Sequence, residues 1–282
     1  MNDDVIEGGT RVQQKNELAQ FLQDHPRLFV LTGAGMSTGS GIPDYRDSEG
    51  KWKRPAPMNY DLFMGQAPAR ARYWARSMVG WRSFGRAQPN AAHFALAALQ
   101  KAGHVTLLVT QNVDRLHQAA GTQDVVDLHG RLDQVRCMAC EMRLPRKEWQ
   151  VLLEQANPHW LAREAAVAPD GDADLDETDF SDFRVPDCPK CGGVVKPDVV
   201  FFGESVPRER VQQSMQALES SDAMLVAGSS LMVYSGYRFA LAAARAGLPI
   251  AAINLGQTRA DALLTLKVNQ PVDEALKAML PG

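Results

Sequence analysis

The chain has few cysteines and no long hydrophobic run. It holds 4 cysteines among 282 residues, and no stretch of about 18 uninterrupted apolar residues occurs, so no membrane-spanning helix is expected. Residues 1–10 are acidic and polar, and they lack the basic start and apolar run of a secretory signal. They also lack the Arg-rich character of an organelle presequence. The sequence therefore predicts a cytoplasmic protein of a bacterium-like cell, with no membrane partner.

An excess of charge of either sign is missing as well. The net charge is −3 and charged residues make up 22% of the chain, which gives no reason to expect a nucleic-acid partner, although a local basic patch is compatible with that net charge. Apolar residues make up 45%, an ordinary share for a packed protein. The length suits one large domain, alone or with a small one, and we expect a monomer.

The four cysteines form two Cys-x-x-Cys pairs, Cys137 with Cys140 and Cys188 with Cys191. Without a secretion signal, disulfides are the less favoured interpretation. Four thiolates complete the tetrahedral shell of Zn²⁺ and leave no position for water, so the pattern predicts one structural zinc ion. The alternative is a set of unpaired or redox-active thiols. Residues 141–187 separate the pairs, so further structure must pack between them.

Strand-like and helical segments alternate along most of the chain. Strands are expected at residues 27–31, 105–110, 124–128, 194–202, 223–227 and 249–255, and helices at 16–23, 67–84, 90–102, 208–219 and 237–246. This alternation predicts an α/β fold with a Rossmann-type, doubly wound parallel sheet. It stops between the cysteine pairs. We therefore expect a Rossmann-type domain from residues 1–130 and 194–282, and a small inserted zinc-binding lobe from residues 131–193.

Glycine and polar residues follow three of the expected strands. Gly33-Ala34-Gly35 lets the backbone approach a ligand and can turn its amides toward phosphate. By itself the motif fits an ordinary tight turn, and Thr38 stands where a dehydrogenase fingerprint has its third glycine. Ligands of open α/β sheets bind at the carboxyl ends of the strands. One shared nucleotide crevice is therefore predicted, with further turns at Gly228-Ser229-Ser230 and Asn254-Leu255-Gly256.

Several motifs in a fixed order resemble the sirtuin family. They are Gly33-Ala34-Gly35-Met36-Ser37, residues 40–46 (Ser-Gly-Ile-Pro-Asp-Tyr-Arg), residues 110–117 (Thr-Gln-Asn-Val-Asp-Arg-Leu-His), His129-Gly130, the two cysteine pairs, residues 196–204, Gly228-Ser229-Ser230 and Asn254-Leu255-Gly256. The resemblance spans roughly residues 18–272. Tyr45 replaces the usual phenylalanine, and Val113 replaces a frequent isoleucine; both changes are mild.

In detail the chain is most similar to class II sirtuins, especially the fourth mitochondrial sirtuin of animals. Residues 72–76, 169–172, 196–204 and 233–239 carry that similarity.

The resemblance implies an NAD⁺-dependent protein-lysine deacylase that removes an acetyl, acidic or long-chain acyl group. In this family the acyl oxygen of a modified lysine attacks the ribose carbon that bears nicotinamide. Nicotinamide leaves, and a base then activates a ribose hydroxyl, so that the acyl group departs on ADP-ribose. A base must titrate near neutrality and reach the ribose, which suits His129, whereas a lone histidine at a strand end would more often be structural. His117 is expected to be a packing residue.

The resemblance also assigns the cofactor contacts. Asn112 and Asp114 are expected to hold the nicotinamide carboxamide, although Asp114 could instead cap a helix. Gln111 should approach the ribose, and Tyr45 should shield the reactive carbon from water. The full set expected to bind NAD is Gly33, Ala34, Gly35, Ser37, Asp44, Tyr45, Arg46, Gln111, Asn112, Val113, Asp114, Gly228, Ser229, Ser230, Asn254, Leu255, Gly256 and Val272.

The substrate is expected to be an acylated lysine of a protein, bound as an extended strand between residues 200–204 and 232–236. Tyr73 and Arg76 resemble a class II pair that faces the acyl group, where arginine can bind a carboxylate. The alternative is a buried Tyr73 and a solvated Arg76. The acidic residues 170–182 are either a solvated loop, which is the favoured interpretation, or a lid near the acyl channel.

Three other functions remain open at this point. The same crevice could transfer ADP-ribose to a protein. A dehydrogenase is disfavoured by Thr38 in the glycine fingerprint, and a zinc-bearing module without catalysis is disfavoured by the presence of His129, Asn112 and Asp114.

Overall fold

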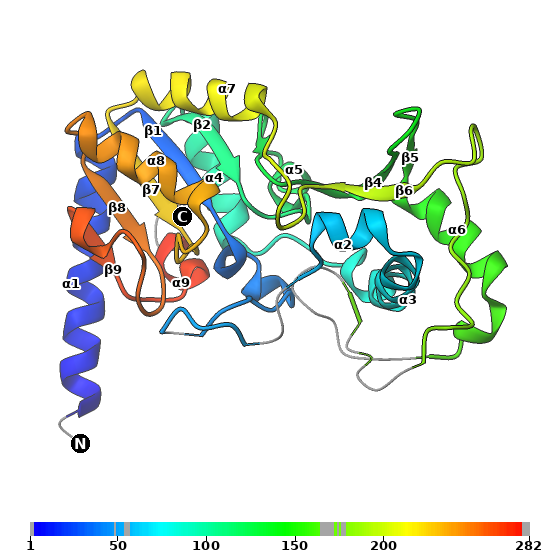
Figure 1. Cartoon of the computed structure of the whole chain (residues 1–282). Coiled ribbons are helices and arrows are strands. Elements are labelled where there is room, and N and C mark those ends of the chain that lie inside the picture. The colour runs from blue at the N-terminus through cyan, green and yellow to red at the C-terminus, as the bar shows by residue number, and fades with distance from the viewer. Residues whose placement is uncertain are drawn as a thin grey trace.

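The computed structural model describes residues 3–47, 49–53, 57–163, 172, 173, 175 and 179–277, with side chains from residue 13 onward. Figure 1 shows a large α/β part, which contains both ends of the chain, beside a smaller lobe built on long strands and helix α3. Within these ranges no helix has the length and apolar character needed to cross a bilayer.

The larger part is organised around a six-stranded parallel sheet with the order β3-β2-β1-β7-β8-β9. Its strands are β1 (Leu28–Thr32), β2 (Val105–Thr110), β3 (Val126–Asp127), β7 (Ala223–Ala227), β8 (Ile250–Ile253) and β9 (Leu266–Val268). β1, β7 and β8 are buried along their whole length, as expected for strands covered on both faces. The predicted doubly wound sheet is confirmed, and its strand order reverses between β1 and β7.

Helices cover both faces of this sheet. Successive residues of β1 point to opposite faces, so Leu28 and Val30 belong to one hydrophobic cluster, and Phe29 and Leu31 to another. The first cluster includes side chains of α1 (Asp3–Asp24), α4 (Ala91–Lys101) and α9 (Val272–Lys277). The second includes side chains of α7 (Arg208–Glu219) and α8 (Tyr234–Arg245).

The smaller lobe contains an antiparallel sheet with the order β5-β4-β6. Its elements are β4 (Gly130–Cys137), β5 (Arg143–Pro145), α6 (Arg146–Ala156), a 3-10 turn at Pro158–Trp160 and β6 (Val195–Val199). Two earlier helices, α2 (Tyr60–Gly65) and α3 (Ala67–Phe84), share its core. Trp74 of α3 packs on Trp149 of α6 with ring centroids 5.4 Å apart. Residues 131–193, the predicted lobe, thus make up only part of this core.

The sequence prediction misplaced several boundaries. α1 begins at Asp3 rather than at residue 16, and α8 begins at Tyr234 rather than at residue 237. β6 ends at Val199, three residues before the predicted end. The strands β4, β5 and β9 and the helices α2, α5 (Leu116–Ala119), α6 and α9 were not predicted. Residues 170, 171, 174 and 176–178 of the acidic stretch 170–182 lie outside the described residues, so the role of this stretch stays a prediction.

Candidate active site

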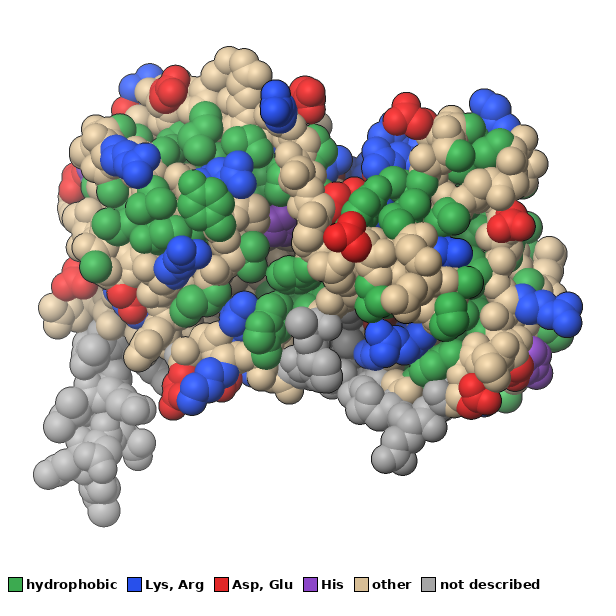
Figure 2. Space-filling model, viewed as in Figure 1, with side chains coloured by type: hydrophobic (Ala, Val, Ile, Leu, Met, Phe, Trp, Pro, Cys, Tyr) green, Lys and Arg blue, Asp and Glu red, His purple; other side chains and the backbone are tan. Residues whose placement is uncertain are grey.

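A cavity of about 870 Å³ opens between the carboxyl edge of the large sheet and the smaller lobe. Figure 2 shows the furrow between these two parts, with hydrophobic side chains on its walls. Residues that directly follow β1, β2, β7 and β8 all line it, together with His129 shortly after β3. Of the predicted cofactor residues, Gly33, Ala34, Gly35, Ser37, Asp44, Tyr45, Arg46, Gln111, Asn112, Val113, Asp114, Gly228, Ser229, Ser230, Asn254 and Leu255 line this cavity.

Two predicted cofactor residues lie elsewhere. Val272 begins α9 and is buried in the hydrophobic cluster beneath the sheet. Gly256 is held by a hydrogen bond from its N–H to Asn269 Oδ1 at 2.9 Å. Neither lines the cavity, so their expected contact with the adenosine end of NAD stays a prediction.

The loops after β1 and β7 pack against each other at the point where the strand order reverses. Gly35 N–H donates to the Gly228 carbonyl at 2.8 Å, so this amide is already used. A Cβ at Gly33 would lie 2.7 Å from Ser229 Cβ. These glycines therefore serve loop-to-loop packing as well as access to a ligand, which the sequence prediction did not foresee.

Three backbone amides on this edge remain available. Within the described part of the chain, the N–H groups of Ala34, Ser229 and Ser230 donate no hydrogen bond, and all three residues line the cavity. Amides at the carboxyl edge of a parallel sheet are a common phosphate site. The donor set thus fits the pyrophosphate of a dinucleotide.

Buried polar groups form the floor of the cavity. Asn112 Nδ2 donates to the Gly33 carbonyl and to Ser37 Oγ, both at 3.0 Å, and Ser37 Oγ donates to Asp114 Oδ2 at 2.7 Å. Because Nδ2 is engaged, Asn112 Oδ1 is the atom left for a ligand amide. Asp114 Oδ1 also accepts from Leu116 N–H at 2.9 Å, at the first residue of α5, although the N-cap position itself is Arg115. Burial raises the pKa of Asp114.

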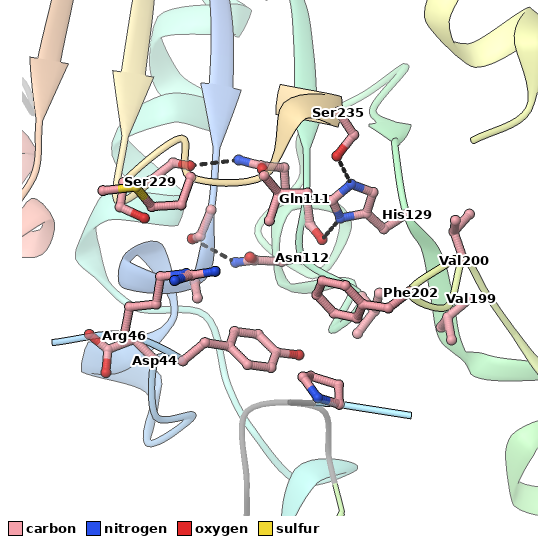
Figure 3. Close-up of a pocket in the computed structure, with 18 of the residues that line it drawn as sticks. Asp44, Arg46, Gln111, Asn112, His129, Val199, Val200, Phe202, Ser229 and Ser235 are labelled. Atoms are coloured by element: carbon pink, nitrogen blue, oxygen red, sulfur yellow. Dashed lines mark hydrogen bonds between the residues drawn. The ribbon is translucent and has the colours of Figure 1, made fainter. Parts of the chain in front are cut away.

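His129 stands on the wall between the two sheets, as Figure 3 shows. Its carbonyl accepts from Val200 N–H at 2.7 Å, which ties the end of β3 to the segment after β6. Its Nδ1 lies 3.0 Å from the Gln111 carbonyl, and its Nε2 lies 2.7 Å from Ser235 Oγ. Burial, followed by the charges of Arg210 and Arg238, lowers the pKa of His129 to about 4, against the raising effect of the Gln111 carbonyl.

The loop from Asp44 to Lys53 forms the opposite rim. Arg46 donates to the Gly50 carbonyl at 2.7 Å, and its guanidinium carbon lies 4.0 Å from the ring centroid of Trp52. Asp44 is paired with Lys53. Residues 48 and 54–56 of this region lie outside the described part of the chain.

The predicted acyl pair separates. Tyr73 lines the cavity and packs on Phe63 and Phe201, with ring centroids 5.4 and 5.3 Å away. Arg76 does not line it; its Nε donates to the Ala173 carbonyl at 2.9 Å, and its own carbonyl accepts from Ala173 N–H. The Nε of Arg76 therefore has a backbone partner, and its contact with an acyl group stays a prediction.

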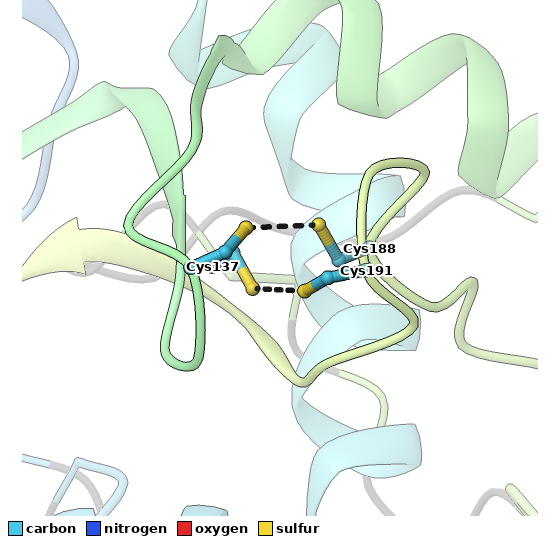
Figure 4. Close-up of side chains that lie close together, drawn as sticks. Cys137, Cys188 and Cys191 are labelled. Atoms are coloured by element: carbon cyan, nitrogen blue, oxygen red, sulfur yellow. Dashed lines mark hydrogen bonds between the residues drawn. The ribbon is translucent and has the colours of Figure 1, made fainter.

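Four thiols meet at the far end of the smaller lobe (Figure 4). The sulfurs of Cys137, Cys140, Cys188 and Cys191 lie within 4.8 Å of one another. Sulfurs bound to a tetrahedral zinc at about 2.3 Å are about 3.8 Å apart. The contacts Cys137–Cys191 at 3.5 Å and Cys140–Cys188 at 3.8 Å fit that geometry. A Cβ at Gly193 would lie 2.8 Å from Ala139 Cβ and 3.1 Å from Cys137 Sγ, so a side chain there would crowd the cysteine cluster.

Sequence reasoning missed several residues of the site. Trp52 and Arg238 line the cavity and were not predicted at all, whereas Phe202, Tyr234 and Ser235 were predicted only as parts of the two substrate segments, without the role of their side chains. Ser235 contacts a residue 106 positions away, so no local spacing signals the contact. His117, predicted to be a packing residue, is buried and lies 2.9 Å from Thr32 Oγ1.

The fold and the site together define a dinucleotide-binding α/β protein with a tetrathiolate lobe. The Sir2 family model matches residues 33–235, and the chain therefore belongs to the Sir2 family. An NAD-dependent protein deacetylase of Bordetella pertussis is 67% identical over 272 residues, which covers 96% of this chain and 99% of that protein.

Solved Sir2 structures agree with the fold. One bound to a propionylated peptide has a TM-score of 0.74 and 30% identity, covering 94% of this chain and 96% of that one. Another, in complex with a peptide and NAD⁺, has a TM-score of 0.71 and 30% identity, covering 93% and 95%.

Proposed function

We propose that the protein is an NAD-dependent protein-lysine deacylase that releases nicotinamide, the free lysine and O-acyl-ADP-ribose. One observation carries this proposal. His129 lines the same cavity as the free backbone amides of Ala34, Ser229 and Ser230 and the side chain of Asn112. Relatives named NAD-dependent protein deacetylase, at 67% and 60% identity over more than nine-tenths of the chain, support it.

His129 has the protonation state that a general base needs. The Gln111 carbonyl can only accept, so Nδ1 must carry the hydrogen, and Nε2 keeps its lone pair. Burial lowers the pKa of His129 to about 4, below the near-neutral value expected from the sequence, so the ring is neutral at pH 7 but is a weaker base than expected. His129 can therefore take the proton of a ribose hydroxyl through Nε2 and hold it while the acyl group moves.

The other cavity residues bind and orient NAD, which supplies the ribose carbon that accepts the acyl oxygen. The amides of Ala34, Ser229 and Ser230 fit its phosphates. Asn112 Oδ1 suits the NH₂ of the nicotinamide carboxamide, beside Asp114. Tyr45 and Arg46 form a rim that excludes water from the reacting carbon. Zinc holds the two cysteine knuckles of the lobe and takes no part in the chemistry.

The protein substrate is proposed to present its acyl-lysine as an extended segment. The Sir2 structures bound to acetylated and propionylated peptides support an acylated peptide as the substrate. The two flanking segments need revision, because Tyr234, Ser235 and Gly236 belong to the first turn of α8. This leaves Met232 and Val233, of which Val233 has an extended backbone, to pair with a peptide opposite residues 200–204.

The acyl preference follows from the walls of the channel. Tyr73, Phe201 and Phe202 offer aromatic surface, which suits a short or apolar acyl chain. Because Arg76 Nε donates to the Ala173 carbonyl, Arg76 gives no support to a preference for an acidic acyl group. The similarity to class II sirtuins stays a prediction, and a preference for glutaryl-lysine peptides over acetyl-lysine peptides would support it. The predicted cytoplasmic location and monomeric state stay predictions.

The test is nicotinamide release from NAD⁺ over a panel of acetyl, propionyl, succinyl, glutaryl and lipoyl lysine peptides. We expect release that requires an acylated peptide and is greatest for acetyl or propionyl. His129→Ala should abolish turnover, whereas His104→Ala, a histidine outside the cavity, should leave it unchanged. Release without peptide, or ADP-ribose found on a protein, would instead support mono-ADP-ribosyl transfer in the same crevice.

A further inference from the structure

The Nε2 atom of His129, which the proposed mechanism needs free, already has a partner. Ser235 Oγ lies 2.7 Å from it, and Figure 3 shows the two side chains pointing at each other from α8 and from the end of β3. Because Nδ1 donates to the Gln111 carbonyl, Nε2 is an acceptor, so the Ser235 hydroxyl must donate to it. The neutral ring is therefore held at both nitrogens.

An imidazole nitrogen has one in-plane lone pair, so it accepts one good hydrogen bond at a time. A ribose hydroxyl that approaches Nε2 has to take the place of the Ser235 hydrogen. After the ribose proton has moved to Nε2, that nitrogen becomes a donor. The Ser235 oxygen, whose lone pairs remain available, can then accept from it.

We propose that Ser235 is a positioning residue for His129, whose hydroxyl donates to Nε2 in the resting enzyme and accepts from Nε2–H once the base is protonated. The inference rests on the proposed role of His129 as the base. In the exchange the ribose O–H bond breaks and the Nε2–H bond forms, so the neutral ring gains a positive charge, while the electron pair left on the ribose oxygen forms the bond to the acyl carbon.

The first turn of α8 is built to keep Ser235 in place. Val233 is the extended cap residue, and its carbonyl accepts from Gly236 and Tyr237 N–H. Gly236 packs closely on Gln111, since a Cβ there would lie 2.6 Å from Gln111 Oε1. The turn that carries Ser235 thus rests on the same residue whose carbonyl fixes Nδ1.

Positive charges around the His129 ring disfavour its protonated form. A hydrogen-bond acceptor for Nε2–H would therefore stabilise the protonated base. Arg210 of α7 and Arg238 of α8 both disfavour a positive ring, and neither pairs with a carboxylate in the described ranges. The Arg210 guanidinium instead reaches the Leu128 carbonyl at 3.5 Å. The α8 amino terminus adds further positive potential. In the described part of the chain, the His129 ring contacts two possible acceptors, the Gln111 carbonyl and the Ser235 oxygen.

The test combines a titration with steady-state kinetics on the full-length, zinc-loaded enzyme. The six histidines are labelled with ¹³C, the His129 signal is assigned with His129→Gln, and its pKa is followed in the wild type, Ser235→Ala and Ser235→Thr. The hydroxyl donates to the neutral ring and accepts from the protonated ring, and the second, charge-assisted hydrogen bond is the stronger, so we expect Ser235→Ala to lower the pKa of His129 by about half a unit. Ser235→Thr should restore it.

Turnover gives the second readout. Loss of the acceptor for the protonated base should lower kcat in Ser235→Ala by about 3- to 10-fold, with no rise in the KM for NAD, and Ser235→Thr should recover most of it. Ser220→Ala, at the exposed end of α7, is the matched control and should change neither quantity. An unshifted His129 pKa, or a loss of activity that appears as a higher KM for NAD alone, would overturn the role of Ser235. Full activity of His129→Gln would instead refute the proposed base.

Discussion

Gly228 offers a sharp test of how the two ligand loops are built. It has a φ of +65°, and a Cβ there would lie 2.3 Å from Met36 N and 2.5 Å from Gly35 C. Both atoms are backbone, so no side chain can turn away. Gly228→Ala must therefore push the β1 loop away from the β7 loop and shift the amides of Ser229 and Ser230.

The same chain provides a control for the strained dihedral angle. Gly247 has a φ of +71°, but a Cβ there would meet nothing within 4 Å. A left-handed conformation costs a non-glycine residue about 1–2 kcal/mol, and this applies to both positions. Forcing an extra carbon into a packed contact adds about 1–3 kcal/mol, and this applies to Gly228 alone. We expect Gly228→Ala to lose roughly twice as much stability as Gly247→Ala.

Thermal unfolding and NAD⁺ titration calorimetry measure the two effects. Gly247→Ala should lower the Tm by a few degrees, at about 2–4 °C for each kcal/mol, and keep its affinity for NAD⁺. Gly228→Ala should lower the Tm further and weaken NAD⁺ binding by at least about tenfold, which is about 1.4 kcal/mol. Equal Tm values and equal affinities in the two variants would refute the packing argument.

Three further predictions concern the histidine pair, the zinc lobe and the acyl channel. Burial lowers the pKa of His93 to about 4 and also lowers that of His117. The unfolded chain binds protons near pH 6.5, so the free energy of unfolding should fall as the pH drops from about 6.5 toward 4. Denaturation from pH 7.5 to 5 tests this, and His93→Gln, which can keep the helix cap, should flatten the slope. Cys188→Ser should lose the single zinc ion and lower the Tm by several degrees, and a metal-free wild type of unchanged Tm would contradict this. Arg76→Ala should reduce activity on acetyl and glutaryl peptides equally, through its contact with Ala173; a selective loss on glutaryl would restore the acidic acyl pocket.

Regular periodicity made most of the large sheet predictable. The α3 helix was predicted with its observed ends, because its bulky residues recur at helical spacing from Ala67 to Phe84. β2 was predicted equally well from its apolar run. The first turn of α8 was missed because Ser235-Gly236 resembles a turn, although such residues are well tolerated in the first turn of a helix. The lobe was predicted only as an insertion, since its core is completed by α2 and α3 from far earlier in the chain.

The candidate site, like the fold, could be predicted only in part. Motifs that directly follow strands could be placed, because the carboxyl ends of parallel strands share one edge. The direction of a long side chain could not be predicted. Arg76 was correctly expected on a helix, but its contact with Ala173 depends on a segment distant in sequence. The contact of Ser235 with His129 is unpredictable for the same reason.

The most direct test of the account is mass-spectrometric identification of the products from NAD⁺ and an acetyl-lysine peptide. We predict nicotinamide, deacetylated peptide and O-acetyl-ADP-ribose in equal amounts, all lost in His129→Ala and all retained in His104→Ala. Free ADP-ribose with the acetyl group still on the peptide, or ADP-ribose attached to protein, would contradict acyl transfer in this crevice.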